Sequence, residues 1–177
     1  MRWHRSLIAV TSVAAAGSLM CASFVYARLG DRDSTATYNI TAGTWTPAPP
    51  AECAGMVFTN VITGTGGDDV LYGTVHADLI FGYGGNDVIR GGNQDDCIVG
   101  GLGDDTLYGG NGKDVLIGGN GGDVLNGDNG KDRLFGGDGD DILDGGNAPD
   151  FLDGGQGTDA CSSAPGPDAV LNCEQPV

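Results

Sequence analysis

The chain has 177 residues, of which 34 are glycine, and it carries 24 acidic against 8 basic residues, a formal net charge of -16. This balance argues against a nucleic-acid partner, because a phosphate backbone is bound by lysine and arginine, and it favours cations. High glycine content and high net charge are typical of disordered chains, so the order of the residues determines whether this chain can fold.

The N-terminal segment 1–27 is predicted to be a cleavable signal peptide. A basic start lies within residues 1–5, an apolar run covers residues 7–19, and the small residues Val25 and Ala27 precede a cleavage site after Ala27. An uncleaved anchor is one alternative, and a lipoprotein modified at Cys21 is the other. The signal peptide predicts a secreted, extracellular protein, and association with the cell surface is the alternative.

Residues 28–54 are rich in Thr, Ala and Pro and are predicted to form a loose extended linker. Four cysteines remain after cleavage, and four cysteines allow three pairings in an oxidising compartment. Cys161 and Cys173 are close in the sequence, so we favour this pair, which leaves Cys53 with Cys97. A free thiol at Cys97 is the alternative.

From residue 64 the chain repeats every nine residues without an insertion, and eleven units fill residues 64–162. Position one is glycine in every unit, and position eight is Leu or Ile in ten units and Cys161 in the last. Position six is aspartate in every unit: Asp69, Asp78, Asp87, Asp96, Asp105, Asp114, Asp123, Asp132, Asp141, Asp150 and Asp159. Residues 55–63 form a degenerate unit predicted to be the N-terminal cap, and residues 163–177 are predicted to be the C-terminal cap.

The turn of each unit predicts a calcium site. Its glycines allow positive φ and turn carbonyl oxygens toward one point, and its aspartate adds a carboxylate. These are the hard oxygen ligands that Ca²⁺ takes, and no His, Cys or Met recurs with the repeat to suit a softer metal. All eleven aspartates are therefore predicted metal ligands.

The units 109–117, Gly-Gly-Asn-Gly-Lys-Asp-Val-Leu-Ile, and 136–144, Gly-Gly-Asp-Gly-Asp-Asp-Ile-Leu-Asp, resemble the hemolysin-type, or repeats-in-toxin (RTX), calcium-binding nonapeptide. The resemblance implies an all-β fold, a right-handed parallel β-roll with two units per turn, whose ends we expect the disulfides to close. It also implies one Ca²⁺ between stacked turns, shared by repeats n and n+2. Six odd units leave five gaps and five even units leave four, so the upper limit is nine ions.

In such a roll the turns of the odd repeats stack in one column and those of the even repeats in another, and the two columns are not equally regular. Odd repeats keep glycine at position four, whereas three even repeats carry Val75-His76-Ala77, Gln94 and Ala148-Pro149 in the turn. We expect His76 to be a tolerated loop residue rather than a ligand. The odd column is therefore predicted to bind better, with its surest ions held by Asp87, Asp105, Asp123 and Asp141.

Alternation along the three-residue strand points position eight into the core and its neighbours outward. The outer face of the odd repeats is mixed at position nine and is predicted to be solvated. The even repeats form an apolar stripe, which includes Phe81, Val99, Ile117 and Phe135. Two explanations stay open: residues 55–63 or the linker cover the stripe, or it binds a partner.

No enzyme is predicted and no catalytic substrate is expected. The sequence has neither a His-Glu-x-x-His zinc motif nor a Gly-x-Ser-x-Gly nucleophile elbow. We predict a secreted calcium-binding protein that folds on binding the metal. Calcium-dependent adhesion through the even face is the alternative function, and a folding aid for a neighbouring protein is a third.

Overall fold

The computed structural model describes residues 40–41, 44–45, 48–162 and 168–176. The predicted signal peptide and most of the predicted linker lie outside the described residues. Among the residues that are described, no helix is long and apolar enough to span a membrane.

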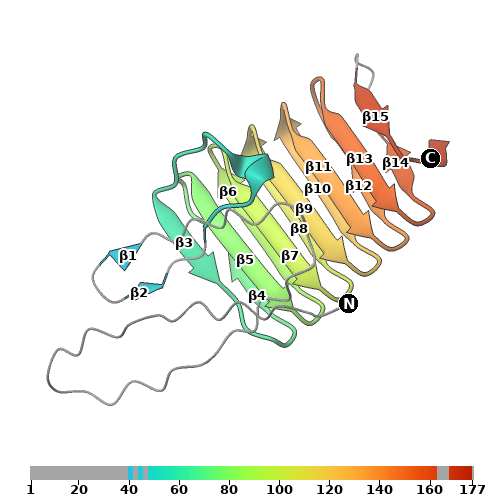
Figure 1. Cartoon of the computed structure of the whole chain (residues 1–177). Coiled ribbons are helices and arrows are strands. Elements are labelled where there is room, and N and C mark those ends of the chain that lie inside the picture. The colour runs from blue at the N-terminus through green and yellow to red at the C-terminus, as the bar shows by residue number, and fades with distance from the viewer. Residues whose placement is uncertain (1–39, 42–43, 46–47, 163–167, 177) are drawn as a thin grey trace, which may run out of the picture. The chain divides into compact units, whose positions relative to one another are not determined.

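Two parallel seven-stranded sheets form the body of the molecule (Figure 1). The odd sheet takes its strands from the odd repeats and is continued by a last short strand: β4 (Val70–Tyr72), β6 (Val88–Asn93), β8 (Thr106–Gly112), β10 (Val124–Gly130), β12 (Ile142–Asp144), β14 (Ala160–Ser162) and β16 (Gln175–Pro176). The even sheet takes its strands from the even repeats and from both flanks: β3 (Asn60–Thr63), β5 (Asp78–Gly84), β7 (Cys97–Leu102), β9 (Val115–Asn120), β11 (Arg133–Asp138), β13 (Phe151–Gln156) and β15 (Ala169–Leu171).

Neighbouring strands of each sheet come from repeats n and n+2. Leu107 of β8 pairs with Leu125 of β10, and Leu116 of β9 pairs with Leu134 of β11. Two nonapeptides therefore make one turn of the solenoid. The predicted all-β parallel β-roll is confirmed.

Position eight of the repeat fills the space between the two sheets. Nine of these side chains have no exposed surface: Ile80, Ile89, Ile98, Leu107, Leu116, Leu125, Leu134, Leu143 and Leu152. They form one continuous column with Cys161, and Ile62, Leu71 and Cys173 pack against its ends. Each buried Leu or Ile contributes about 1.5–3 kcal/mol of hydrophobic stabilisation, and truncation to Ala costs more because it leaves a cavity.

Both predicted disulfides are present. Cys53 bonds to Cys97 with their Cα atoms 6.1 Å apart, and Cys161 bonds to Cys173 at 5.8 Å. The first joins the segment before the repeats to β7. The second joins β14 to the segment between β15 and β16, so the bridges lie near the two ends of the roll.

The segment that precedes the repeats is more structured than the predicted extended linker. β1 (Ile40–Thr41) pairs antiparallel with β2 (Thr44–Trp45), and a 3₁₀ turn, η1 (Ala51–Cys53), follows. The sequence prediction missed both because two- and three-residue elements leave no periodicity to detect.

Residues 51–58, which we call the strap, pack on the outer face of the even sheet. Cys53, Met56 and Phe58 of the strap join a second apolar cluster with β5, β7, β9 and β11: Leu79, Phe81, Cys97, Val99, Val115, Ile117 and Phe135. Arg133 also donates a hydrogen bond of 2.7 Å from Nη1 to the Glu52 carbonyl. Of the two explanations for the apolar stripe, this packing supports coverage by the chain itself.

Candidate metal centre

The aspartates at position six form two buried ladders along the roll. In each ladder, Oδ1 of one aspartate accepts a hydrogen bond from the backbone N–H of the aspartate two repeats earlier. Asp87 donates to Asp105 at 2.8 Å, and Asp114 donates to Asp132 at 2.8 Å. One carboxylate oxygen is thus used to hold the stacked turns in register.

In ten aspartates the other oxygen, Oδ2, is buried, and it has no hydrogen-bond partner in the part of the chain that the structure describes. These are Asp87, Asp96, Asp105, Asp114, Asp123, Asp132, Asp141, Asp150, Asp159 and Asp168. A buried polar atom without a partner costs on the order of 1–3 kcal/mol, and more when it is charged. Ten such atoms in one small protein are far above the few that native structures contain. These oxygens are therefore the candidate ligand atoms of the structure.

Burial also changes the protonation of these carboxyl groups. Desolvation raises the pKa of Asp114 to about 7, against a smaller lowering effect of the hydrogen bond from the Asp96 backbone. The same main cause raises the pKa of Asp96, Asp123 and Asp132 to about 7 and that of Asp105 and Asp141 to about 6. Neighbouring aspartates in the ladder add to each increase by charge repulsion. A cation beside Oδ2 would reverse this effect.

The glycine at position one closes the space around Oδ2. A Cβ atom at Gly109 would lie 2.6 Å from Oδ2 of Asp114 and 2.8 Å from the carbonyl oxygen of Gly127, in the turn two repeats further on. The position-one glycines do not have positive φ, in contrast to the glycines of positions two and four such as Gly119 and Gly121. Glycine is therefore required at position one by space, and not by φ as the sequence suggested.

The first turn of each column differs from those that follow. Oδ2 of Asp69 accepts hydrogen bonds from the backbone N–H (2.6 Å) and hydroxyl (2.9 Å) of Thr65. Oδ2 of Asp78 likewise accepts a 2.5 Å bond from the Thr74 backbone. Two of the eleven predicted ligands, Asp69 and Asp78, thus have hydrogen-bond partners for Oδ2, the oxygen that has none in the other nine. The signal was visible in the sequence, since threonine replaces glycine at position two in these two repeats.

Both ladders continue past the last complete repeat. The backbone of Asp150 donates to Oδ1 of Asp168 at 2.7 Å, and that of Asp159 donates to Oε2 of Glu174 at 2.6 Å. Asp168 keeps the nine-residue spacing and lies in the predicted C-terminal cap, 163–177. Glu174 breaks the spacing, so no repeat pattern could have identified it.

The irregular even turns keep the fold but carry backbone strain. Position four adopts positive φ in most turns, and there Gln94 has φ 72° and Ala148 has φ 90°. His76 occupies this position in the second repeat without positive φ, is exposed, and donates its N–H to the Thr74 hydroxyl at 3.1 Å. The even column is therefore the less regular one in the structure as well.

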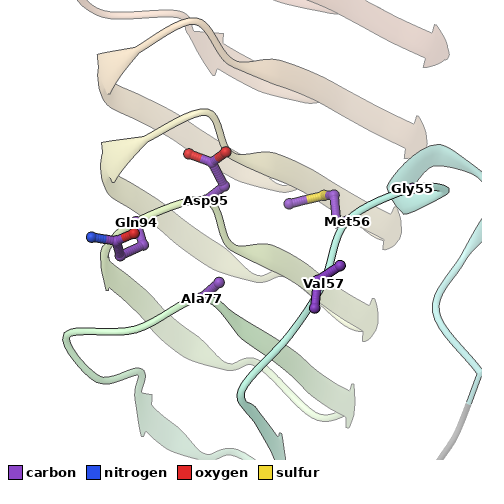
Figure 2. A pocket seen from close by; sticks show the side chains of 6 residues that line it. All are labelled: Gly55, Met56, Val57, Ala77, Gln94 and Asp95. Atoms are coloured by element: carbon purple, nitrogen blue, oxygen red, sulfur yellow. The ribbon is translucent and has the colours of Figure 1, made fainter.

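A hollow lies where the strap crosses these irregular turns. Figure 2 shows Met56 and Val57 of the strap opposite Ala77, Gln94 and Asp95 of the even turns. Asp95 is engaged there, since its Oδ1 accepts a 2.9 Å hydrogen bond from the Lys113 backbone.

The donor set of the ladders fits Ca²⁺. After the first turn of each column, the regular turns offer one orphaned carboxylate oxygen near a carbonyl of the next stacked turn, as Asp114 does with Gly127. Hard oxygen donors suit this ion. In the described part of the chain no three His, Cys, Asp or Glu side chains cluster as a metal site. A site built from one carboxylate per turn and main-chain carbonyls would not form such a cluster.

Fold and site together define a β-solenoid with oxygen ligands repeated along its turns. The family model described as RTX calcium-binding nonapeptide repeat matches overlapping segments that run from residue 55 to residue 169: 55–89, 63–97, 72–107, 90–125, 108–143, 126–161 and 135–169. The chain belongs to this family and is a calcium-binding repeat protein. Comparison with curated proteins and with solved structures gives no significant match.

Proposed function

We propose that this is an exported, non-enzymatic protein that binds several Ca²⁺ ions along its two aspartate ladders and folds as it binds them. The observation that carries the proposal is the series of ten buried Oδ2 atoms without a hydrogen-bond partner. A folded chain without metal would have to leave these oxygens desolvated and unpaired, or protonate them.

The proposed ligands are the aspartates of these ten oxygens, which add Asp168 to nine of the eleven position-six residues. Asp69 and Asp78 are proposed to cap the columns, because Thr65 and Thr74 already satisfy their Oδ2 atoms. The regular turns of the odd column support stronger binding there. An upper limit of nine ions follows if each stacked pair of complete repeats shares one.

Electrostatics supports folding that is coupled to binding. The eleven repeats hold 19 aspartates and 4 lysines or arginines, a local charge of -15. Stacking the turns brings these charges together in a solvent-poor core, and bound divalent cations would offset the repulsion. Calcium therefore has a structural role in this proposal, since metal binding supplies free energy of folding.

Two neighbouring aspartates allow a matched test. Asp104 and Asp105 each accept one backbone hydrogen bond, from Gly122 (2.9 Å) and from Asp87 (2.8 Å), but only Asp105 has an orphaned, buried Oδ2. Both Asp105→Asn and Asp104→Asn remove one negative charge. We expect D105N to lose bound Ca²⁺ and D104N to bind as the wild type does.

The measurement is calorimetric titration with Ca²⁺, followed by counting of bound ions and by far-ultraviolet circular dichroism. The wild type should gain a β spectrum on titration and lose it in chelator. A β spectrum that does not change when chelator is added would contradict the proposal that folding is coupled to calcium binding. Equal numbers of bound ions in D105N and D104N would contradict the proposal that the aspartate ladder binds calcium.

Export and the lack of catalysis rest on the sequence and on the family. The basic start, apolar run and small residues before Arg28 support cleavage after Ala27. Mass spectrometry of the exported chain should find an N-terminus at Arg28, and a retained leader would contradict this. The strap contacts Phe81 and its neighbours, so adhesion through the even face is the weaker alternative.

A further inference from the structure

Among the described residues, no segment packs on the outer face of the odd sheet, and this face has a regular pattern. Position seven contributes a row of mainly β-branched residues: Val70, Val88, Thr106, Val124, Ile142 and Ala160. Position nine contributes a parallel row: Tyr72, Arg90, Tyr108, Asn126, Asp144 and Ser162. The strap packs on the opposite sheet and leaves Val70 61%, Ile142 51% and Tyr72 65% exposed.

This surface is more apolar than the solvated face that position nine alone predicts. Position nine is mixed, as expected, but position seven adds an aligned apolar row beside it. Paired strands stack in register along the roll (Figure 1), so residues that share a position in the repeat lie in line along the sheet. In the position-seven row Val70, Val124 and Ile142 are exposed, whereas Val88, Thr106 and Ala160 are half-buried. Apolar patches on a protein surface often mark contacts.

We propose that this face binds the same face of a second copy of the chain. The two copies are related by a two-fold axis that lies between the sheets, parallel to the strands, and passes between β8 and β10. Such an axis reverses the strand order, so that β6 of one copy faces β12 of the other and β8 faces β10. An interface of this kind uses one patch twice and must be self-complementary.

The two rows meet this requirement. Position seven faces position seven, so the apolar row packs on its own reversed copy, with Val88 opposite Ile142 and Thr106 opposite Val124. In the second row, Arg90 faces Asp144 across the interface. Each dimer contains this charge pair twice.

The alternative two-fold axis, along the stack of strands, gives a poor match. It would keep the strand order and reverse the strand direction, so position seven would face position nine. Val88 would then lie against Arg90 of the other copy, and Ile142 against Asp144. Apolar side chains would bury charges without partners, which is costly.

Arg90 and Asp144 cannot satisfy each other within one chain. Strands β8 and β10 separate β6 from β12, which places the outer side chains about 14 Å apart at the usual strand spacing. Within its own chain, Arg90 lies over the Tyr108 ring at 4.0 Å and interacts with the charge of Asp128. Asp144 has the like charge of Asp128 for a neighbour, so a cation from a second copy would improve its surroundings.

The dimer rests on the proposed function, because the face exists only when the roll is folded. Six short strands give a contact area at the low end for protein interfaces, so we expect a weak dimer with a dissociation constant on the order of 10 µM. Calcium should strengthen it, since bound cations lower the net negative charge that makes two copies repel.

Analytical ultracentrifugation of the full chain in saturating Ca²⁺, over micromolar to submillimolar concentrations, tests the dimer. Circular dichroism of the same samples separates loss of the fold from loss of association. A folded wild type that stays monomeric over this range overturns the proposal, whatever its calcium binding. We expect a reversible monomer–dimer equilibrium.

Charge reversal tests the pairing. Arg90→Glu alone and Asp144→Arg alone each place like charges opposite each other twice, and each should weaken the dimer at least tenfold. An equimolar mixture of the two variants should recover association, because a heterodimer pairs Glu with Arg at one contact and Arg with Asp at the other. Failure of the mixture to associate overturns the assigned axis.

A lysine substitution tests the apolar row. Val70 and Val75 are equally exposed, at 61% and 62%, but only Val70 lies on the face. Val70→Lys should weaken the dimer and Val75→Lys should not. Equal effects of the two substitutions contradict the proposed surface.

Discussion

The odd and even sides of the roll carry the same buried aspartate and the same buried Leu or Ile, but their turns and outer faces differ. Every odd repeat keeps glycine at position four, and the outer face of the odd sheet is open. The even side has Gln94 and Ala148 at positive φ, and the strap and the Cys53–Cys97 bond cover part of its outer face.

A row of asparagines adds to this contrast. On the even side, Asn93, Asn111, Asn129 and Asn147 occupy position three and form a ladder of side-chain hydrogen bonds of 2.9–3.2 Å. Such ladders stabilise stacked parallel strands without a metal. The odd side has metal-independent contacts too, namely the Cys161–Cys173 bond at β14 and the hydrogen bonds of Asp138 with Asn120 and Gln156. The even side has a longer ladder and, in addition, the apolar packing of the strap.

The largest predicted effect comes from removing one ligand in each column. Asp123→Asn alters the odd ladder and Asp132→Asn the even ladder, and both aspartates have an orphaned, fully buried Oδ2. We expect D123N to raise the calcium concentration at the folding midpoint about tenfold, because the odd turns lack the strap and the asparagine ladder that support the even turns. D132N should raise it less.

The measurement is the circular dichroism signal of each variant as Ca²⁺ is titrated. Equal shifts for the two variants would show that the columns contribute equally. A larger shift of the calcium midpoint for D132N would show that the even column contributes more to folding than the odd column.

The second prediction concerns the covalent contact of the even side. Replacing Cys53 and Cys97 together by Ser opens a loop of 44 residues and should lower the free energy of unfolding by about 2–4 kcal/mol in calcium. The loss should be local as well, since Cys53 holds the strap on β5, β7 and β9.

Hydrogen exchange in saturating Ca²⁺ would locate this loss. Amides of β5, β7 and β9 should exchange faster in the double variant, while those of β6, β8 and β10 should keep more protection. A uniform loss of protection would mean that the bridge stabilises the whole roll equally. The matched control is the Cys161/Cys173 double Ser variant, whose bridge spans 12 residues at the other end.

The repeat made most of the fold predictable. The strict period and the alternation along each strand predicted the position-eight core. The register of repeats n and n+2 came from the resemblance to the RTX family, and the burial of the aspartates was found only in the structure. The disulfide pairs followed from proximity in sequence. Coverage of the even face by the chain itself was one of two alternatives that the sequence left open. The sequence could not decide between them, because the docking of a nonrepeating segment depends on long-range packing.

The site was predictable in its composition but not at its ends. The sequence named all eleven aspartates as ligands and ranked the odd column first, whereas Thr65 and Thr74 give two of them hydrogen-bond partners. It placed Asp168 in the C-terminal cap and did not indicate Glu174. End turns lack one stacked neighbour, so their contacts depend on individual residues rather than on the period.

The third prediction concerns pH in the absence of calcium. Burial raises the pKa of Asp96, Asp114, Asp123 and Asp132 from 3.8 to about 7. A raised pKa in the folded state means that the stability contributed by these groups is fully present below the unfolded value. It is lost as pH rises through about 7. The metal-free chain should therefore show more β structure at pH 5 than at pH 8.

Calcium binding should show the opposite dependence, because bound Ca²⁺ needs the carboxylates ionised. For a site that must release one proton with a pKa near 7, affinity should fall about fivefold between pH 7 and pH 6. Titration calorimetry in buffers of different ionisation enthalpy would detect the released protons. The raised pKa values belong to the folded chain, so calcium binding without proton release at pH 6 contradicts them only where circular dichroism shows that the chain is folded before calcium is added.

The smallest predicted effect would repair one irregular turn. Gln94 has φ 72° at a position where the regular turns have glycine, and its side chain is exposed. A left-handed backbone costs a residue with a Cβ about 1 kcal/mol relative to glycine. Gln94→Gly should therefore stabilise the calcium-bound roll by about 1 kcal/mol and lower the calcium midpoint of the even column.

Gln94→Ala is the matched control, because it removes the same side chain and keeps the Cβ that makes the backbone costly. If Q94A stabilises as much as Q94G, in thermal unfolding at fixed Ca²⁺, the gain comes from the side chain and not from the backbone. A gain for Q94G alone would place the weakness of this even turn in its backbone. The Cβ atom of Gln94 alone would then account for the lower stability of this even turn relative to the odd turns. The ladder of buried carboxylates is the same in both columns.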